Sequence, residues 1–531
     1  MTAPALAPPE PPATAGRHDH DRFAYLLRAE WIKFRTVRGW VIAVIAAMLL
    51  TLLLGLFTAI NSQEGCPGGP CHYVIPTGPG GEAVTDTFYF VHRPLTADGS
   101  ITVRLTSLTG VVESGLTPSG PAHTAPDLEP WTKAGLIVSA GTRQGSAYAA
   151  VMVTGHHGTR MQWNYTGDQA GLAGRASAAA PRWLRLTRSG DTLTGYDSAN
   201  GTRWTRISTV HLPGLARTVQ AGLFATSPTH VVQTSQQISG GSGTGNATDA
   251  TAIFDHVTLA GGWPGDLPGT HWRGALVGGG SSSTYTTGSL SGYHRAGGTF
   301  TVTGSGDIAP GAPGGTSIGS NLAAVFIGLI AIVVVGALFI TVEYRRGLIR
   351  LTLAASPRRG RVLAAKAVVL GAVTFAAGLA GVAGAVLLGD HLARENGSPI
   401  YPASAFTEIR VIVGTAALFA LAAVFALGVG ALLRNGAGAV TVVFTAITLP
   451  YLITVAFPVL PAGAAGWVLR VTPAAAFAIQ QAIPQYPHVA GQYAPSGGYY
   501  PLSPYAGFAV LCLYAALTLG LAVLLLRRRD A

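Results

Sequence analysis

The sequence is short of charge. Only 11% of its 531 residues are Asp, Glu, Lys or Arg, whereas soluble domains carry about 25%. This shortage excludes a globular water-soluble enzyme, and a mean hydropathy of +0.39 indicates an integral membrane protein. The net charge of +11 would fit a nucleic-acid-binding protein only if the cations gathered on a soluble domain. Many of them flank apolar runs instead, so no nucleic-acid partner is expected.

Lysine is nearly absent, and this bears on catalysis. The three lysines are Lys33, Lys133 and Lys366, and none of them precedes Ser or Thr. A phosphate-binding loop requires a glycine-rich turn followed by Lys and then Ser or Thr. We therefore expect the chain to bind no nucleotide and no other cofactor, and to be no enzyme.

Cysteine is equally scarce, with three residues in all. Cys66 and Cys71 follow the first apolar run and are candidates for a disulfide if that segment faces an oxidising compartment. Two free thiols are the alternative. Cys512 lies inside the last apolar run, where a small packing residue is expected.

Six apolar runs are long enough to cross a membrane. The first, Val41–Ile60, has twenty residues and would span about 30 Å as a helix, the thickness of the hydrocarbon core. A cleaved signal peptide would have a shorter apolar region. The other five runs are Leu322–Val342, Ala367–Leu388, Ile409–Leu433, Val440–Leu460 and Tyr505–Leu526. The turn between the fourth and fifth spans, "LLRNGAGA", is expected to be very tight.

The positions of the cations predict the orientation. They precede the first span, separate the second from the third, and follow the fourth and the sixth. Cytoplasmic loops are rich in Lys and Arg, and a cation at mid-membrane costs about 2.5–3.5 kcal/mol. We expect a multi-pass protein of the plasma membrane with both termini in the cytoplasm.

The segment before the first span has two parts. Residues 1–20 are rich in Pro and Ala and are expected to be disordered. Residues 21–60 are expected to form an amphipathic elbow helix at the membrane surface and the first span. The residues that define the elbow helix are Phe23, Leu27, Trp31, Lys33, Phe34 and Arg35.

A long segment of different character separates the first two spans. Between residues 61 and 303, runs such as "SITVRLTSL", "AYAAVMVTG" and "VQAGLFATS" alternate apolar and polar residues between turn signals. This pattern predicts an extracellular antiparallel β-sandwich. Residues 304–320 are expected to be a linker, and residues 321–531 the second to sixth spans. An external segment at 461–504 is expected to begin with a re-entrant helical hairpin.

The loop at 343–366, "EYRRGLIRLTLAASPRRGRVLAAK", holds six arginines. Anchoring at the cytoplasmic surface explains the cations alone. The apolar residues between them indicate in addition a short helix that docks into a groove of a partner. The candidate docking residues are Glu343, Arg345, Arg346, Leu348, Ile349, Arg350, Arg358 and Arg359.

"LLRAEWIKFRTVRGW" before the first span and the arginine-rich loop resemble the permease subunits of type-2 ABC exporters, in a form familiar from actinobacteria. The resemblance implies that the loop carries a coupling helix, which docks on a separate ATPase subunit that binds ATP and Mg. It also implies a second permease copy, in a homodimer or a heterodimer. The first external loop of such permeases is short, so the inserted domain is a departure.

The inserted domain resembles concanavalin A-like (laminin G-type) jelly rolls in "PWTKAGLIVSAG" and "PRWLRLTRSGDTLTGYDSANGTRWTRI". Trp183 and Trp204 are expected in its core. The predicted fold class is thus a six-helix transmembrane domain with an all-β jelly-roll sandwich inserted between helices 1 and 2. Such domains often bind glycans, so cell-surface glycan is a candidate partner, with core packing as the alternative role of the aromatic residues. The candidate contacts are Trp163, Tyr165, Trp272 and Asp255.

Catalysis and metal binding are not expected in the inserted domain. Glycoside hydrolysis needs two carboxylates about 5–10 Å apart, and jelly-roll glucanases place them in a Glu-x-Asp string that is absent here. His156 and His157 are adjacent, so on a strand they would face opposite sides. We expect them at a solvated hairpin tip.

Two other classes of protein remain as alternatives to a permease. One is a membrane-anchored glycan-binding or sensory protein without transport activity. The six spans argue against it, since an anchor needs one helix. The other is an immunity or regulatory membrane protein with permease ancestry.

Overall fold

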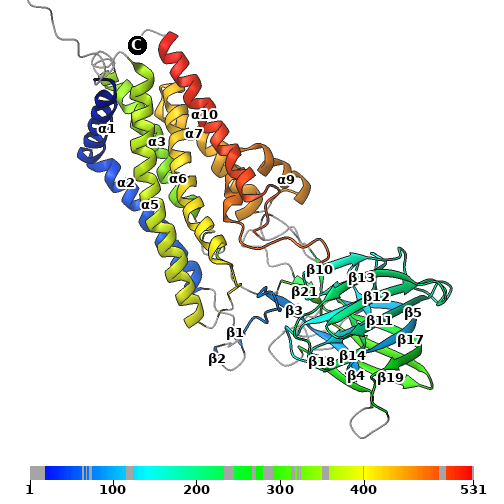
Figure 1. Cartoon of the computed structure of the whole chain (residues 1–531). Helices are drawn as coiled ribbons and strands as arrows, with labels where there is room; N and C mark the ends of the chain where they lie inside the picture. Colours follow the sequence, from blue (N-terminus) through cyan, green and yellow to red (C-terminus); the bar gives the residue numbers. More distant parts are fainter. Residues whose placement is uncertain are drawn as a thin grey trace, which may run out of the picture.

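The computed structural model has two parts, a bundle of long helices and a β-sandwich at one end of it (Figure 1). We refer to the two ends of the bundle as the sandwich end and the α1 end. The structure describes residues 18–61, 65–66, 69–70, 74–114, 123–232, 244–265, 271–278, 291–311, 317–319, 322, 325–349, 358–396, 398, 400–457, 459–489, 495 and 498–528.

Among these residues, six helical segments are long and apolar enough to cross a membrane. They confirm the six spans expected from the sequence. The segments are α2 (Arg38–Ile60), α3 (Val325–Arg345), α5 (Arg359–Glu395), α6 (Ala405–Leu433), Gly436–Ala456 and α10 (Pro504–Arg528).

The tight turn between the fourth and fifth spans is confirmed. Arg434 ends α6 in the left-handed region at φ 55°, and the Asn435 side chain accepts a hydrogen bond from the Gly438 amide at 3.2 Å. The fifth span then alternates α7 (Gly436–Val443) and α8 (Leu449–Tyr451) with two π-helical turns, at 444–448 and 452–456. Pro450 lacks an amide hydrogen and accounts for part of this irregularity.

The arginine-rich loop is narrower than the expected range 343–366. Glu343 lies within α3 and Lys366 lies within α5. With 37 residues, α5 is about 55 Å long, well beyond the roughly 30 Å of a hydrocarbon core. The helix therefore extends past the membrane. Residues 346–358 separate α3 from α5, and of these the structure describes 346–349 and 358.

The first helix, α1 (His18–Thr36), packs against α2 and α5 at the end of the bundle away from the sandwich. The C-terminal end of α10 lies at the same end (Figure 1). The expected disordered tail, residues 1–20, lies almost wholly outside the described residues.

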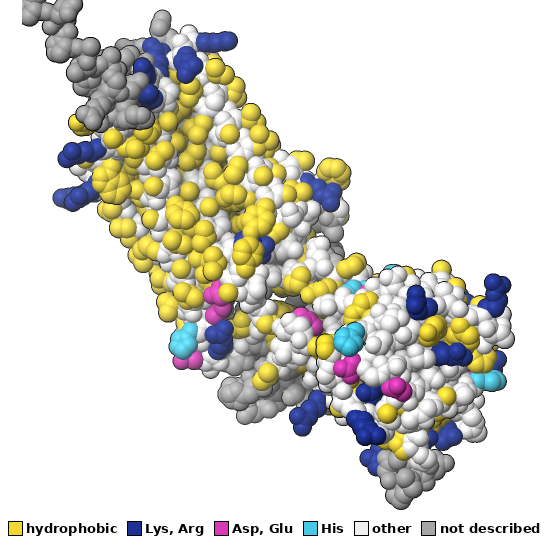
Figure 2. Space-filling view, in the orientation of Figure 1, with side chains coloured by type: hydrophobic (Ala, Val, Ile, Leu, Met, Phe, Trp, Pro, Cys, Tyr) yellow, Lys and Arg dark blue, Asp and Glu magenta, His cyan; other side chains and the backbone are white. Residues whose placement is uncertain are grey.

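The bundle core lies along α3 and α6, whose apolar residues are the most buried of the six spans. Gly336 permits a close approach, because an added Cβ would lie 2.6 Å from the carbonyl oxygen of Ala423. On α2 and α10, by contrast, residues such as Leu53, Phe57 and Leu521 are exposed. Figure 2 shows apolar side chains over this face of the bundle, as a lipid-facing surface requires.

The inserted domain consists of two large antiparallel sheets, which confirms a β-sandwich. The first sheet has the order β10-β9-β8-β7-β14-β4-β18. The second has the order β13-β12-β11-β5-β17-β20-β19, with β6 paired to β5. The first sheet contains β4 (Phe88–Thr96), β7 (Lys133–Ser139), β8 (Tyr148–Thr154), β9 (Thr159–Trp163), β10 (Gly167–Ala170), β14 (Thr218–Thr226) and β18 (Arg273–Val277). The second contains β5 (Gly99–Ser114), β6 (His123–Pro126), β11 (Arg182–Ser189), β12 (Thr192–Ser198), β13 (Thr205–His211), β17 (Thr248–Gly261), β19 (Gly292–Ala296) and β20 (Thr299–Gly304).

The core of the sandwich lies between the two sheets, with Leu136, Leu223 and Phe254 among its buried residues. Trp183 and Trp204 were expected in this core, and that expectation is wrong. Trp183 alternates with the buried Leu184 along β11 and so points to the outer side of the sheet. Trp183 and Trp204 are half-buried beneath Arg104 and Arg185.

A short ribbon joins the sandwich to the bundle. It consists of β3 (Val84–Asp86) and β21 (Ile308–Pro310), which are antiparallel. The linker expected at 304–320 thus contains a strand. A second small ribbon, β1 (Gly65–Cys66) with β2 (Gly69–Pro70), precedes it. Cys71 lies outside the described residues, so the disulfide with Cys66 stays a prediction.

Two smaller elements complete the described chain. β15 (His230–Val232) pairs with β16 (Thr244–Asn246) beside the sandwich. After the fifth span, α9 (Ala462–Val471) is followed by a 3₁₀ helix at Pro473–Gln480. The re-entrant hairpin expected at the start of the segment 461–504 stays a prediction.

Candidate functional site

Four charged side chains meet at the α1 end of the bundle, and we call them the charge cluster: Glu30, Lys33, Glu343 and Lys366. Lys366 lies at its centre. Its Nζ donates hydrogen bonds to Glu30 Oε2 at 2.7 Å and to Glu343 Oε1 at 2.6 Å. The side chains of Lys366, Glu30 and Glu343 are almost completely buried. Because these residues belong to α5, α1 and α3, the cluster joins three helices.

Lys33 closes the cluster on its solvent side. Its Nζ lies 2.9 Å from Glu30 Oε1 and 3.3 Å from Glu343 Oε1. Burial alone would lower the pKa of Lys33, but hydrogen bonds to Glu30 and Glu343 and their negative charges outweigh it, so the pKa is raised. With two lysines and two glutamates, the cluster is neutral when all four groups are charged.

Aromatic rings pack beneath the charge cluster. The Lys366 ammonium lies 4.9 Å from the centre of the Phe339 ring, within the range of a cation–π contact. Phe339 in turn packs against Phe34 of α1 and Trp40 of α2, with ring centroids 6.1 and 4.8 Å apart. The cluster is thus shielded from the bundle core, and α2 is connected to it through Trp40.

The energetics make the charge cluster a rigid junction. A buried ion pair contributes little net stability, yet removing one partner costs about 3–5 kcal/mol because the other charge is left unpaired. A lysine ammonium is a compact point charge that can donate in several directions, which suits Lys366 between two carboxylates. Within the described part of the chain, Glu343 Oε2 has no hydrogen-bond partner.

The predicted docking residues divide into two groups. Arg345, Arg346, Leu348 and Arg358 are exposed at the α1 end, where Figure 2 shows Lys and Arg side chains. Glu343 and Ile349 are buried, and Arg359 is half-buried and donates a hydrogen bond to the Leu526 carbonyl oxygen of α10. Arg350 lies outside the described residues. The docking role stays a prediction.

The predicted elbow residues all lie on α1, and their amphipathic role at the membrane surface stays a prediction. Phe34 is buried, Phe23, Leu27 and Lys33 are half-buried, and Trp31 and Arg35 are exposed. Sequence reasoning missed Glu30 and gave Lys366 no role. The available signal was that two of the three lysines and a lone glutamate lie beside apolar runs.

The structure does not bring the four glycan candidates together. Trp163 ends β9 near one edge of the seven-stranded sheet, and Trp272 precedes β18 at the opposite edge. Both pack against the core between the sheets. Asp255 lies in the other sheet and accepts two hydrogen bonds from Arg104, at 2.7 and 2.5 Å. Tyr165 is buried.

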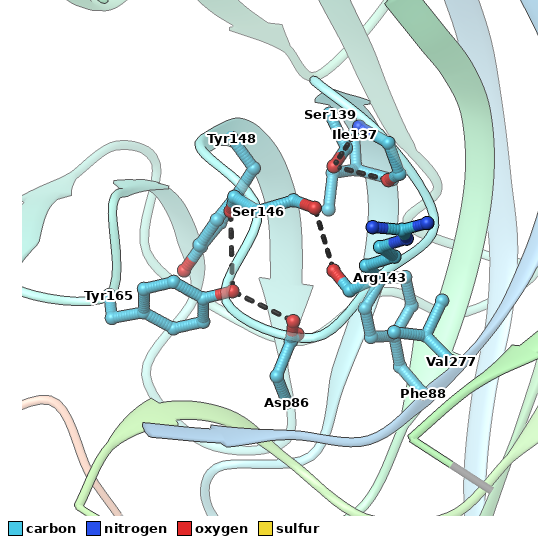
Figure 3. A pocket seen from close by; sticks show the side chains of 10 residues that line it. Asp86, Phe88, Ile137, Ser139, Arg143, Ser146, Tyr148, Tyr165 and Val277 are labelled. Carbon is cyan, nitrogen blue, oxygen red and sulfur yellow. Dashed lines mark hydrogen bonds between the residues drawn. The ribbon is translucent and has the colours of Figure 1, made fainter. Parts of the chain in front are cut away.

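A hollow in the sandwich contains Asp86, Tyr148 and Tyr165 (Figure 3). Asp86 Oδ2 accepts hydrogen bonds from the Tyr165 hydroxyl at 2.7 Å and from the Gly145 amide at 2.9 Å. Burial raises the pKa of Asp86 to about 6, although both hydrogen bonds act in the opposite direction. The rest of the lining is mixed: Phe88, Ile137 and Val277 are apolar, and Ser139, Arg143 and Ser146 are polar. The contacts of Asp86 give it a structural role.

One group of side chains has donor atoms that could hold a metal ion. Asp127, Glu129 and His230 place one ligand atom each within 4.8 Å of one another. One imidazole and two carboxylates suit a divalent transition metal. His230 Nδ1 already lies 2.5 Å from Glu129 Oε1. The sequence held no sign of this group, since His230 is about a hundred residues from the two carboxylates. The exposed turn predicted at His156 and His157 is confirmed.

The fold and the charge cluster define a class: a multi-pass membrane protein with a β-sandwich between its first two spans. The family model for ABC-2 family transporter proteins matches residues 187–531, well over half of the chain. The chain belongs to this family. It is therefore the membrane subunit of a transporter, and the family associates with an ABC ATPase and with the lipid bilayer. The match begins within the sandwich and includes the second to sixth spans.

Solved structures resemble the chain only weakly. A functionally unknown protein from Saccharomyces cerevisiae is 13% identical, covers 36% of this chain and 83% of its own, and has a TM-score of 0.21. A Scytalido-glutamic peptidase bound to a peptide-based transition-state analogue is 6% identical, covers 42% and 98%, and has a TM-score of 0.24. These scores carry no argument about function. No curated protein matches the chain.

Proposed function

We propose that this chain is the permease subunit of an ATP-driven exporter, and that a separate ATPase subunit docks at the α1 end. The observation that carries the proposal is the charge cluster. It joins the elbow helix α1 to the two helices that flank the arginine-rich loop. ATP and Mg would bind to the partner, because this sequence contains no phosphate-binding loop.

The position of the cluster explains how docking can reach the spans. Glu343 lies two residues before the end of α3, and Lys366 lies seven residues after the start of α5. A force on the loop between these helices therefore acts within about two helical turns of the cluster on either side. The same cluster holds Glu30, so α1 moves with the loop.

Electrostatics makes this unit move as one body. Separating Lys366 from either glutamate would leave a buried unpaired charge, which costs several kcal/mol. A tilt of the whole unit avoids that cost. Movement of the partner on ATP binding would then pass to α3 and α5 together, and through Trp40 to α2.

The charge distribution supports an orientation. Arg345, Arg346 and Arg358 lie at the α1 end, which the positive-inside rule places in the cytoplasm. Both the first described helix and the end of α10 lie there (Figure 1). The sandwich is then extracellular, at the outer end of the transport path. A second permease copy, identical or related, would complete that path.

The alternative of a membrane-anchored glycan-binding or sensory protein gains no support from the geometry. Its candidate residues lie on different sheets or at opposite edges of one sheet, and Tyr165 is buried. A glycan-binding role as an addition to transport stays a prediction.

The test is purification of the tagged full chain from its native membranes in mild detergent, with mass spectrometry of the proteins that accompany it. We expect an ABC ATPase subunit. The variant Leu348→Asp should lose it, because Leu348 is 44% exposed at the docking end. Val74→Asp, an exposed apolar residue at the sandwich end, is the matched control and should retain it. Absence of an ATPase under every nucleotide condition would contradict the proposal.

A further inference from the structure

Three segments meet at the junction between the sandwich and the bundle. β3 follows the first span, β21 leads to the second, and the segment after the 3₁₀ helix at Pro473–Gln480 belongs to the bundle. Figure 1 shows β3, β21 and β10 at the face of the sandwich nearest to the bundle. The convergence means that one site can control how the two parts are held together.

The contact that closes the junction is made by His488. Its Nε2 donates a hydrogen bond to the carbonyl oxygen of Tyr165 at 2.8 Å, and the residue is only 3% exposed. Tyr165 belongs to the turn between β9 and β10, where Asn164 and Tyr165 have φ of 43° and 62°. Residues other than glycine rarely adopt this left-handed backbone conformation. The backbone of the turn is therefore unusual at the point of contact with His488.

The β9–β10 turn also makes a hydrogen bond to β3, the strand that follows the first span. The Tyr165 hydroxyl donates to Asp86 at the end of β3. Nearby, Lys133 Nζ donates to Asp307 Oδ1 and to the Ile308 carbonyl oxygen, both at 2.6 Å. Lys133 is fully buried. These bonds fix β3 and β21 to the sandwich, and the His488 hydrogen bond ties the segment 481–489 to it.

We propose that His488 is a pH-sensitive latch that holds the sandwich against the bundle at neutral pH and releases it in acid. The proposal concerns the junction alone and does not depend on the identity of the ATPase partner.

The charged groups around His488 explain why the latch is released in acid and not in base. Lys133 of β7 and Arg160 of β9 disfavour a positive imidazole, whereas Asp168 of β10 favours it. Burial is the largest effect and lowers the pKa of His488, and the hydrogen bond to Tyr165 only partly opposes it. Asp168 is already engaged by Arg160 and Gln162, so it is poorly placed to compensate a new charge. Tyr486 packs near the ring from the same segment.

The sign follows from linkage. In the released state His488 is in water and has its ordinary pKa near 6.5, whereas in the latched state its pKa is lower. The released state therefore binds protons more tightly, and latching is weakened as pH falls below about 6.5. Between the two pKa values, the ratio of released to latched protein therefore rises as the pH falls.

The test is hydrogen–deuterium exchange of the full chain in lipid nanodiscs between pH 8 and 5, with exchange times scaled for the intrinsic effect of pH. We expect protection of peptides from the β9–β10 turn and from residues 481–489 to fall together in acid. Peptides from β5 and β17, within the second sheet, should not change and serve as the internal control.

Two variants make the result decisive. His488→Gln retains an N–H donor but cannot become charged, so its junction should show no loss of protection in acid. His488→Ala should lose protection at every pH. If His488→Ala leaves the junction protected, or if His488→Gln shows the same loss in acid as the wild type, the proposal is wrong.

Discussion

At the scale of residues, the chain uses its few lysines unlike its arginines. All three lysines form ion pairs with carboxylates, and Lys133 and Lys366 are buried. Many of the arginines lie at exposed positions. A lysine ammonium can contact two carboxylates from different helices, whereas the planar guanidinium of arginine favours one carboxylate in a fork. Lys366 is thus matched to a junction of three helices.

The charge cluster predicts that Glu343→Gln has opposite effects on stability in the wild type and in a Lys366→Met variant. Lys366→Met should destabilise the protein by about 3–5 kcal/mol, because Glu30 and Glu343 are left with only Lys33. Glu343→Gln should destabilise the wild type for the same reason. In the Lys366→Met background, however, Glu343→Gln should stabilise, since it restores neutrality. Unfolding of the purified variants in detergent measures all four states, and simple additivity would contradict the assigned geometry.

Asp86 makes a prediction about pH. Its pKa is raised by burial to about 6, so the folded state binds the proton more tightly than the unfolded state, whose pKa is near 3.8. This contribution to stability is present in acid and is lost as pH rises from about 4 to 6, by up to about 3 kcal/mol.

The matched variant is Asp86→Asn, whose amide oxygen can accept the same two hydrogen bonds as Asp86 Oδ2. Stability of the sandwich, measured in the full chain by exchange of peptides from β7 and β14, should fall from pH 4 to 6 relative to this variant. If the stability difference between the wild type and Asp86→Asn is the same at every pH, Asp86 is not buried as described.

At the scale of elements, the short segment after α3 has one residue that is expected to matter for folding and a neighbour that is expected to matter for docking. Ile349 is only 6% exposed, whereas its neighbour Leu348 is 44% exposed. Ile349→Asp should therefore reduce the yield of folded protein, because an unpaired charge would be buried. Leu348→Asp should leave yield and thermal unfolding unchanged and affect only partner retention. Equal loss of yield in both variants would mean that Leu348 is also part of the bundle core.

Periodicity in the sequence was sufficient to predict most elements. The six apolar runs became six helices, and alternating runs such as 133–141 and 219–227 became β7 and β14. The bounds of α5 were not predictable, because an amphipathic extension past the membrane lacks a continuous apolar signal. Trp183 was misplaced because a large aromatic residue suits either a core or a cation–π contact, and only the register of β11 decides between them.

At the scale of the whole molecule, the candidate site was predictable only in part. Glu343 attracted notice because a carboxylate near lipid is costly. Its partners Glu30 and Lys366 come from segments that only the folded bundle brings together, and no local pattern indicates such a pairing. The same holds for His488 and Tyr165, which are 323 positions apart in the chain. Long-range contacts of this kind decide the function of the site but leave no periodic signal.

The proposed route of coupling runs from the docking loop through the charge cluster to the spans. The most direct test is hydrogen–deuterium exchange of the co-purified complex in nanodiscs, without nucleotide and with ATP, Mg and vanadate. We expect nucleotide to change exchange in α1, at the inner ends of α3 and α5, and in peptides of α6. In Lys366→Met complexes that retain the ATPase, nucleotide should change exchange in the docking loop but not in α6. Nucleotide-induced changes in α6 that are identical in wild type and Lys366→Met would contradict coupling through the charge cluster.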